Sequence, residues 1–147
     1  MKHSLYWLSL SLTIFVLTGC EGYTYTFNQQ PIFSPETLFS DFNIKDTALK
    51  SCVEQAIFDQ NVTKSTQLTH LNCSNAGISK LAGLEIFTGL THLNLNGNHL
   101  TEIKPLLFLS HIQVILLGAN KHLLCSDAQL LANNMSGSIK LPTHCSK

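Results

Sequence analysis

The chain contains no arginine, since all nine of its basic residues are lysines. Charged residues make up only 12% of 147 residues, and nine acidic residues bring the formal net charge to zero. Without arginine there is no planar fork for bidentate contacts to phosphate, and without a basic surplus there is no electrostatic footprint for nucleic acid. We therefore expect no nucleic-acid partner. The hydrophobic share of 44% excludes a wholly disordered chain and suits one globular domain.

Motifs of common catalytic sites are also missing. The sequence has no G-x-S-x-G, no H-E-x-x-H and no phosphate-binding loop. Its cysteines form no C-x-x-C pair of the kind that holds zinc. The acidic residues are scattered along the chain. We expect no enzymatic activity, no cofactor and no metal.

The N-terminus has the pattern of an export signal. Met1-Lys2-His3 gives a positive start, and Leu5 to Val16 follows without a charged residue. This run of about 12 residues is shorter than the roughly 20 that span a bilayer, and it fits the core of a signal peptide. Leu17-Thr18-Gly19-Cys20 comes next. It resembles a lipobox, the processing site of bacterial lipoproteins.

This resemblance implies that residues 1–19 are a lipoprotein signal peptide and that Cys20 is lipidated. Several acyl chains on one residue anchor a protein firmly in a membrane. Lipoproteins retained in the inner membrane usually carry aspartate where this chain has Glu21. The resemblance therefore implies an outer-membrane location, facing the periplasm or the cell surface. The alternative is a signal peptide without lipid, in which Cys20 pairs with another cysteine.

Residues 20–35 are polar and aromatic and show no helical period. We interpret them as a tether between the lipid and the folded domain. Glu21 to Phe27 alternates in polarity and is compatible with an edge strand. Asn28 to Pro31 is expected to break that strand, because proline cannot donate to a sheet.

Four cysteines remain when Cys20 is set aside: Cys52, Cys73, Cys125 and Cys145. An even number in an exported chain predicts disulfides, with three possible connectivities. Proximity along the chain favours Cys52–Cys73 and Cys125–Cys145. Each bond then closes a loop of about 20 residues, which the chain-entropy model values at roughly 3 kcal/mol.

Three segments of the chain align at a constant offset of 22 residues. They begin at Leu68, Leu90 and Ile112, and each has apolar residues at its first, fourth and sixth positions. The alternation of apolar and polar residues predicts strands with one buried face. Asn98 and Asn120 follow the second and third strands and can bond backbone groups where the chain turns. One copy cannot bury its apolar side alone, so neighbouring copies must stack.

The pattern resembles the leucine-rich repeat, L-x-x-L-x-L-x-x-N-x-L, in the 22-residue form of internalin-like bacterial proteins. The copy at residues 90–100 matches it fully, whereas Cys73 and Ala76 depart from it in the first copy. The third copy has His122 where leucine is expected, and the repeats are expected to end there. The resemblance implies an α/β fold, a short leucine-rich-repeat solenoid of about three repeats over residues 67–123, with parallel strands on its concave face.

Caps are expected at both ends of such a solenoid. Residues 36–66 are similar to the N-terminal cap of internalin-like proteins, with a helix whose start Asp46 can cap. Residues 124–147 are expected to form a C-terminal cap pinned by the second disulfide. Ser126 begins a capping-box pattern there, and Ser138 to Leu141 is a possible last strand.

In a leucine-rich repeat the residues between the strand leucines face solvent on the concave sheet. The register therefore predicts a partner-binding surface formed by His70, Asn72, His92, Asn94, Asn96, Val114 and Leu116. Val114 and Leu116 are apolar where earlier copies have histidine and asparagine. They form either a contact patch or part of the core under the C-terminal cap. His70 and His92 could share a metal, but two ligands do not make a site, and we expect exposed imidazoles.

These resemblances imply a monomeric lipoprotein, attached to the membrane through Cys20, whose repeat domain binds an unidentified protein partner in the cell envelope or at the cell surface. One alternative is an accessory lipoprotein that assists the assembly of an envelope machine through its tether or its convex side. Another is a metal or small-ligand binder that uses the two histidines.

Overall fold

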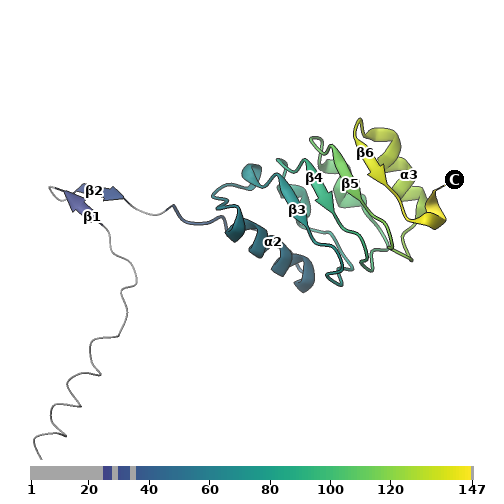
Figure 1. Ribbon diagram of the computed structural model, residues 1–147, viewed down its shortest axis with the longest axis horizontal. Helices are drawn as coiled ribbons and strands as arrows, with labels where there is room; N and C mark the ends of the chain where they lie inside the picture. Colours follow the sequence, from purple (N-terminus) through teal and green to yellow (C-terminus); the bar gives the residue numbers. More distant parts are fainter. Residues whose placement is uncertain (1–24, 28–29, 34–35, 147) are drawn as a thin grey trace, which may run out of the picture. The chain divides into compact units, whose positions relative to one another are not determined.

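The computed structural model describes residues 25–27, 30–33 and 36–146 (Figure 1). The chain divides into two compact units, one ending at Pro35 and the other beginning at Glu36. In the first unit, β1 (Tyr25–Phe27) pairs antiparallel with β2 (Gln30–Phe33). The first strand ends at Phe27, before the predicted break at Asn28 to Pro31, but Gln30 and Pro31 of that segment belong to the second strand, β2. A two-stranded sheet has only edge strands, and an edge strand tolerates proline. The predicted signal peptide and Cys20 lie outside the described residues.

The second unit is built on a four-stranded parallel sheet with the order β3-β4-β5-β6. The strands are β3 (His70–Asn72), β4 (His92–Asn94), β5 (Val114–Leu116) and β6 (Ser138–Lys140). His70 pairs with His92, and His92 with Val114, so the predicted strands and their register are confirmed. β6 continues the sheet, with Ser138 opposite Val114. It lies beside β5 and leaves Val114 and Leu116 half-buried, so the alternative in which these two residues are core under the C-terminal cap is wrong.

Short helical segments connect the strands on the other layer of the molecule (Figure 1). η1 (Ser65–Gln67) precedes β3, η2 (Leu84–Ile86) joins β3 to β4, and η3 (Lys104–Phe108) joins β4 to β5. α3 (Cys125–Asn134) joins β5 to β6, and η4 (Thr143–Cys145) follows β6. Among the residues that the structure describes, no helix is both long enough and apolar enough to cross a membrane.

The capping box expected at the start of α3 is not formed. The residue before the helix is Leu124, which has no side-chain capping hydrogen bond, and Ser126 already lies in the first turn. The backbone oxygen of Leu124 accepts a hydrogen bond from the N–H of Ala128, so the helix begins before the serine. Asp127 is nevertheless in the first turn, where a carboxylate favours the positive end of the helix dipole.

The core lies between the sheet and these connecting segments. The central residues of β3, β4 and β5 are Leu71, Leu93 and Ile115, and each is at most 2% exposed. Their neighbours within each strand point to the opposite face, where they are exposed or half-buried. This alternation is the period of a sheet with one buried side. It leaves the other side of the sheet open to the surroundings.

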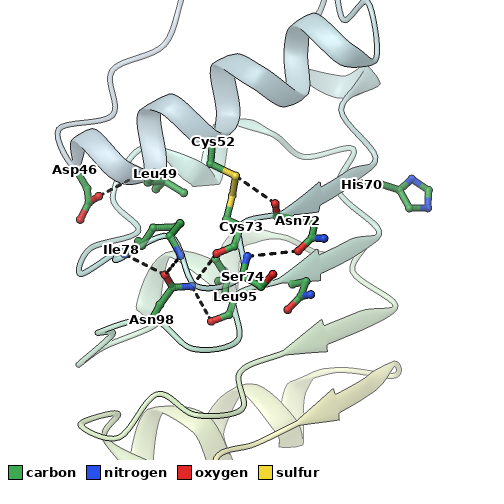
Figure 2. The surroundings of a disulfide bond; sticks show 12 residues. Asp46, Leu49, Cys52, His70, Asn72, Cys73, Ser74, Ile78, Leu95 and Asn98 are labelled. Atoms are coloured by element: carbon green, nitrogen blue, oxygen red, sulfur yellow. Dashed lines mark hydrogen bonds between the residues drawn. A yellow bond between two sulfur atoms is a disulfide. The ribbon is translucent and has the colours of Figure 1, made fainter.

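Two asparagines are buried at the turns that follow β4 and β5. Asn98 is 2% exposed and Asn120 is fully buried. The Asn98 side chain accepts hydrogen bonds from the N–H groups of Ala76 and Ile78, and donates to the oxygens of Cys73 and Leu95 (Figure 2). These bonds satisfy backbone groups that turn inside the core, as the sequence pattern predicts.

α2 (Thr47–Asp59) covers the β3 end of the core. Its Leu49, Val53 and Ile57 are buried at helical spacing. One oxygen of the Asp46 carboxylate accepts a hydrogen bond from the N–H of Leu49, at 3.0 Å, which confirms the predicted cap. The other oxygen accepts from the N–H groups of residues 79 and 80, so Asp46 ties the start of the helix to the first repeat.

Both favoured cysteine pairs form disulfides. Cys52 of α2 is bonded to Cys73, which directly follows β3 (Figure 2). Cys125, the first residue of α3, is bonded to Cys145 in η4. The first bond therefore attaches α2 to the chain just after β3, and the second attaches α3 to η4.

Candidate functional site

A groove of about 510 Å³ lies between α2 and the open face of the sheet. Its floor is formed by residues of β3, β4 and β5, and its wall by one side of α2. The wall residues are Cys52, Gln55, Ala56, Asp59 and Gln60. The groove is therefore a product of the whole domain, because no single repeat contains both a floor and a wall.

Six residues of the predicted partner-binding surface line this groove: His70, Asn72, His92, Asn94, Val114 and Leu116. Val114 and Leu116 are half-buried on the open face, next to the polar residues of the earlier repeats. Asn96 is not part of the lining. Its side-chain oxygen is buried without a hydrogen-bond partner in the described part of the chain. This oxygen lies 3.0 Å from the position that a Cβ atom would have if Gly118 carried a side chain.

The wall of the groove was missed by sequence reasoning, which gave the helix only a covering role. A signal was present, because Cys52, Gln55, Ala56 and Asp59 recur at the spacing of one helical face. This face lies beside the face that carries the buried residues Leu49, Val53 and Ile57. A helix with a buried stripe and an adjacent mixed stripe can form core and groove together.

Wall and floor are joined at two points. The Cys52–Cys73 disulfide links α2 to the end of β3. At the other end of the helix, the Gln60 side chain donates a hydrogen bond of 2.8 Å to the backbone oxygen of His70. The Gln55 side chain also donates to Asp59 across one turn, at 2.7 Å. The disulfide and the Gln60 hydrogen bond fix the position of the wall relative to the floor.

His70 and His92 stack face to face in the groove. Their ring centroids are 4.5 Å apart and the ring planes differ by 9°. Each Nδ1 lies 2.9 Å from the hydroxyl of the preceding threonine, Thr69 or Thr91. The Thr91 hydroxyl also donates its one proton to the backbone oxygen of Thr69. With its proton donated there, the hydroxyl accepts from His92 Nδ1–H, and in that tautomer of the neutral ring Nε2 is an acceptor.

This geometry does not favour a metal between the two histidines. In parallel stacked rings the nitrogen lone pairs point in parallel directions, whereas ligands of one ion must converge on it. In the described part of the chain, one group brings three possible ligand atoms within 4.8 Å of one another, from Cys125, His144 and Cys145. Its two sulfurs form a disulfide and are not the thiolates that a metal binds.

The comparison with family models concerns the part of the chain that contains β3 and β4. Residues 66–108 match the family model described as leucine-rich repeats, in two copies. This match supports leucine-rich repeats in residues 66–108. No curated protein matches the chain. Leucine-rich repeats are commonly non-enzymatic modules for protein–protein interaction, and solenoids of this type bind partners on extended concave surfaces. β5 lies outside the matched residues but keeps the register of the leucine-rich repeats before it.

Proposed function

We propose that the protein is a bacterial lipoprotein, anchored in the outer membrane through Cys20, whose leucine-rich repeats hold a segment of a protein partner in the groove beside α2. In this proposal the domain is a short solenoid, closed at one end by α2 and at the other by α3 with β6. The observation that carries the proposal is the convergence of three successive strands and one helix on a single groove of about 510 Å³.

Two further features support export and anchoring. Leu17-Thr18-Gly19-Cys20 directly follows an uncharged apolar run, as in lipoprotein processing sites. The domain contains two disulfides, which form and persist in oxidising compartments outside the cytoplasm. A lipid anchor would hold the domain, with its groove, close to other envelope proteins.

The groove is tested by crosslinking in intact cells of the source bacterium. His92→Glu together with Asn94→Lys changes the floor of the groove, and captured proteins are identified by mass. A matched control is His99→Glu with Thr101→Lys, which introduces the same two residues at exposed positions of the same repeat outside the groove. We expect the partner to be lost only in the groove variant. Equal capture by both variants would remove the groove from the proposal.

The anchor is tested separately by metabolic labelling with an alkyne fatty acid. The wild-type chain should take up the label, and Cys20→Ser should not. Membrane fractionation of the same samples should show the wild type, but not the variant, with the outer membrane. Equal labelling of Cys20→Ser and the wild type, with the variant still in the outer-membrane fraction, would place the lipid elsewhere and contradict an anchor at Cys20.

A second candidate function rests on the opposite side of the molecule. Ile86 of η2, Phe108 of η3 and Leu130 of α3 follow one another at intervals of 22 residues, and they are 36%, 71% and 49% exposed. η3 contacts both η2 and α3, and none of the three residues lines the groove, so we interpret them as an apolar column on the connecting elements. Such a column favours an accessory lipoprotein that docks into an envelope assembly through its convex side. In the crosslinking experiment, Phe108→Asp would then lose the partner that the groove variant retains.

A further inference from the structure

The groove combines an apolar part of its floor with one carboxylate that has no basic residue beside it in the lining. Val114 and Leu116 supply apolar surface at one part of the lining, and Ala56 adds to it from the wall. Asp59 is the one carboxylate among the lining residues, and no lysine is among them. Within the described residues Asp59 takes part in no ion pair, since the two pairs found there join Lys50 to Glu54 and Lys104 to Glu102.

The position of Asp59 on α2 strengthens this negative character. Asp59 is the last residue of the helix, and the last turn contains no basic residue. The C-terminal end of a helix carries a partial negative charge from its backbone carbonyl groups. The carboxylate therefore adds to the helix dipole instead of offsetting it. One carboxylate oxygen accepts from Gln55, which holds the side chain along the wall of the groove.

The histidine pair adds hydrogen-bond acceptors to the same cavity. The hydrogen bonds at Thr91 suit the tautomer of His92 that carries its proton on Nδ1, and in this tautomer the neutral ring offers Nε2 as an acceptor. Asn72 and Asn94 bring side-chain amide oxygens to the floor, although each already accepts a backbone N–H two residues on. A ligand that donates hydrogen bonds and carries positive charge is the chemical complement of this lining.

We propose that the groove recognises a lysine or arginine side chain of the protein partner, with its methylene stem on the apolar floor and its cation facing Asp59. Long basic side chains bury their stems and keep the charged end in a polar setting. The chain has no arginine and the lining contains no lysine, so no lysine or arginine of the lining competes with a partner's cation for Asp59. This inference rests on the proposed function, because it specifies the partner chemistry of the same groove.

The test is a titration of the full chain in detergent, with isotope-labelled methyl groups of Ala56, Val114 and Leu116 observed by NMR. The probes are Nα-acetyl-lysinamide and Nα-acetyl-norleucinamide, which share the same apolar stem and differ in the terminal ammonium group. We expect saturable shifts with the lysine probe at a Kd on the order of millimolar. The norleucine probe should bind more weakly by about threefold, the effect of a partly exposed ion pair.

Asp59→Asn should reduce the affinity for the lysine probe to that for the norleucine probe. The matched control is Asp41→Asn, which removes an exposed carboxylate outside the groove and should leave both affinities unchanged. Equal binding of the two probes to the wild type, or no saturable shift with either, overturns the recognition of a cation. If the probes give that result while His92→Glu with Asn94→Lys still loses its crosslinked partner in cells, the proposed function stands and only the recognition of a cation fails.

Discussion

The side-chain amide of Asn98 donates a hydrogen bond of 2.9 Å to the backbone oxygen of Cys73, 25 residues earlier in the chain. Cys73 is bonded in turn to Cys52 on α2. A continuous set of contacts thus runs from the wall of the groove, through the first repeat, to the turn of the second (Figure 2). The buried asparagine joins neighbouring repeats, since its other partners include Ala76 and Ile78 of the preceding turn.

Replacing Asn98 by alanine should therefore be costly. The substitution leaves several buried backbone donors and acceptors without partners, and we expect the free energy of unfolding to fall by about 3 kcal/mol. Urea denaturation measures this change. Asn133→Ala, at an exposed position of α3, is the control and should change stability by less than about 0.5 kcal/mol. A cost for Asn98→Ala as small as that of the control would contradict the role of the hydrogen bonds.

Asp46 should make stability depend on pH in the acid range. Burial raises the pKa of Asp46, but hydrogen bonds from the backbone of Leu49, Ser79, Lys80 and Ala48 outweigh burial and bring it below the ordinary 3.8. Since the folded pKa is the lower one, the carboxylate contributes its full stabilisation above pH 3.8 and loses it as pH falls through the folded pKa. Denaturation curves across this window measure the loss.

Asp46→Asn should flatten that acid dependence and lower stability near neutral pH, because asparagine has a single acceptor oxygen where the carboxylate has two. Asp41→Asn is the control, since Asp41 is an exposed carboxylate outside this set of hydrogen bonds. An unchanged slope in Asp46→Asn would assign the acid dependence to other groups.

The Cys52–Cys73 bond occupies a position where the repeat pattern has leucine, and the equivalent Leu95 and Leu117 are fully buried. Cys52→Ala with Cys73→Ala should cost roughly 3 kcal/mol through the lost crosslink. Cys52→Ala with Cys73→Leu should recover about 1–2 kcal/mol of this, because it restores apolar volume at a buried site. Thermal unfolding compares the two. If the leucine variant is no more stable than the alanine variant, the site does not accept the residue that the repeat uses.

Ala119 has a backbone φ of 58°, in the left-handed region that glycine occupies more readily. The equivalent residue of the preceding repeat is Gly97, with φ of 69°. We expect Ala119→Gly to stabilise the fold by about 0.5–1 kcal/mol. Ala132→Gly in α3 is the opposite case and should destabilise by about 1 kcal/mol. Calorimetry of both variants should show melting temperatures that move in opposite directions.

The repeats could be predicted from sequence because their signal is a constant offset. Leu71, Leu93 and Ile115 recur in register, and every copy has the same physical task of covering its neighbour. The fourth strand carries no such signal. Ser138 pairs with Val114, whereas the 22-residue offset of the earlier strands would place Ser136 there. With α3 replacing the short η segment, the connection is longer and the register cannot be extended by counting.

The floor of the candidate groove followed from the same register, but its wall did not. Sequence alone shows which face of α2 is apolar, and thus that Leu49 and Val53 are buried. It does not show that the adjacent face, with Gln55 and Asp59, turns toward the open side of the sheet. That placement depends on the angle at which the helix meets β3, which the disulfide and the Gln60 hydrogen bond set in three dimensions.

Cys52 belongs to the wall of the groove, and its disulfide partner Cys73 directly follows a floor strand. Oxidation of this one pair therefore fastens the groove covalently as well as stabilising the fold. Two copies of identical sequence, one held in a reducing compartment and one in an oxidising compartment, would differ in whether the wall is locked to the floor. The oxidation state of this one cysteine pair therefore determines how rigid the groove is when it meets a partner.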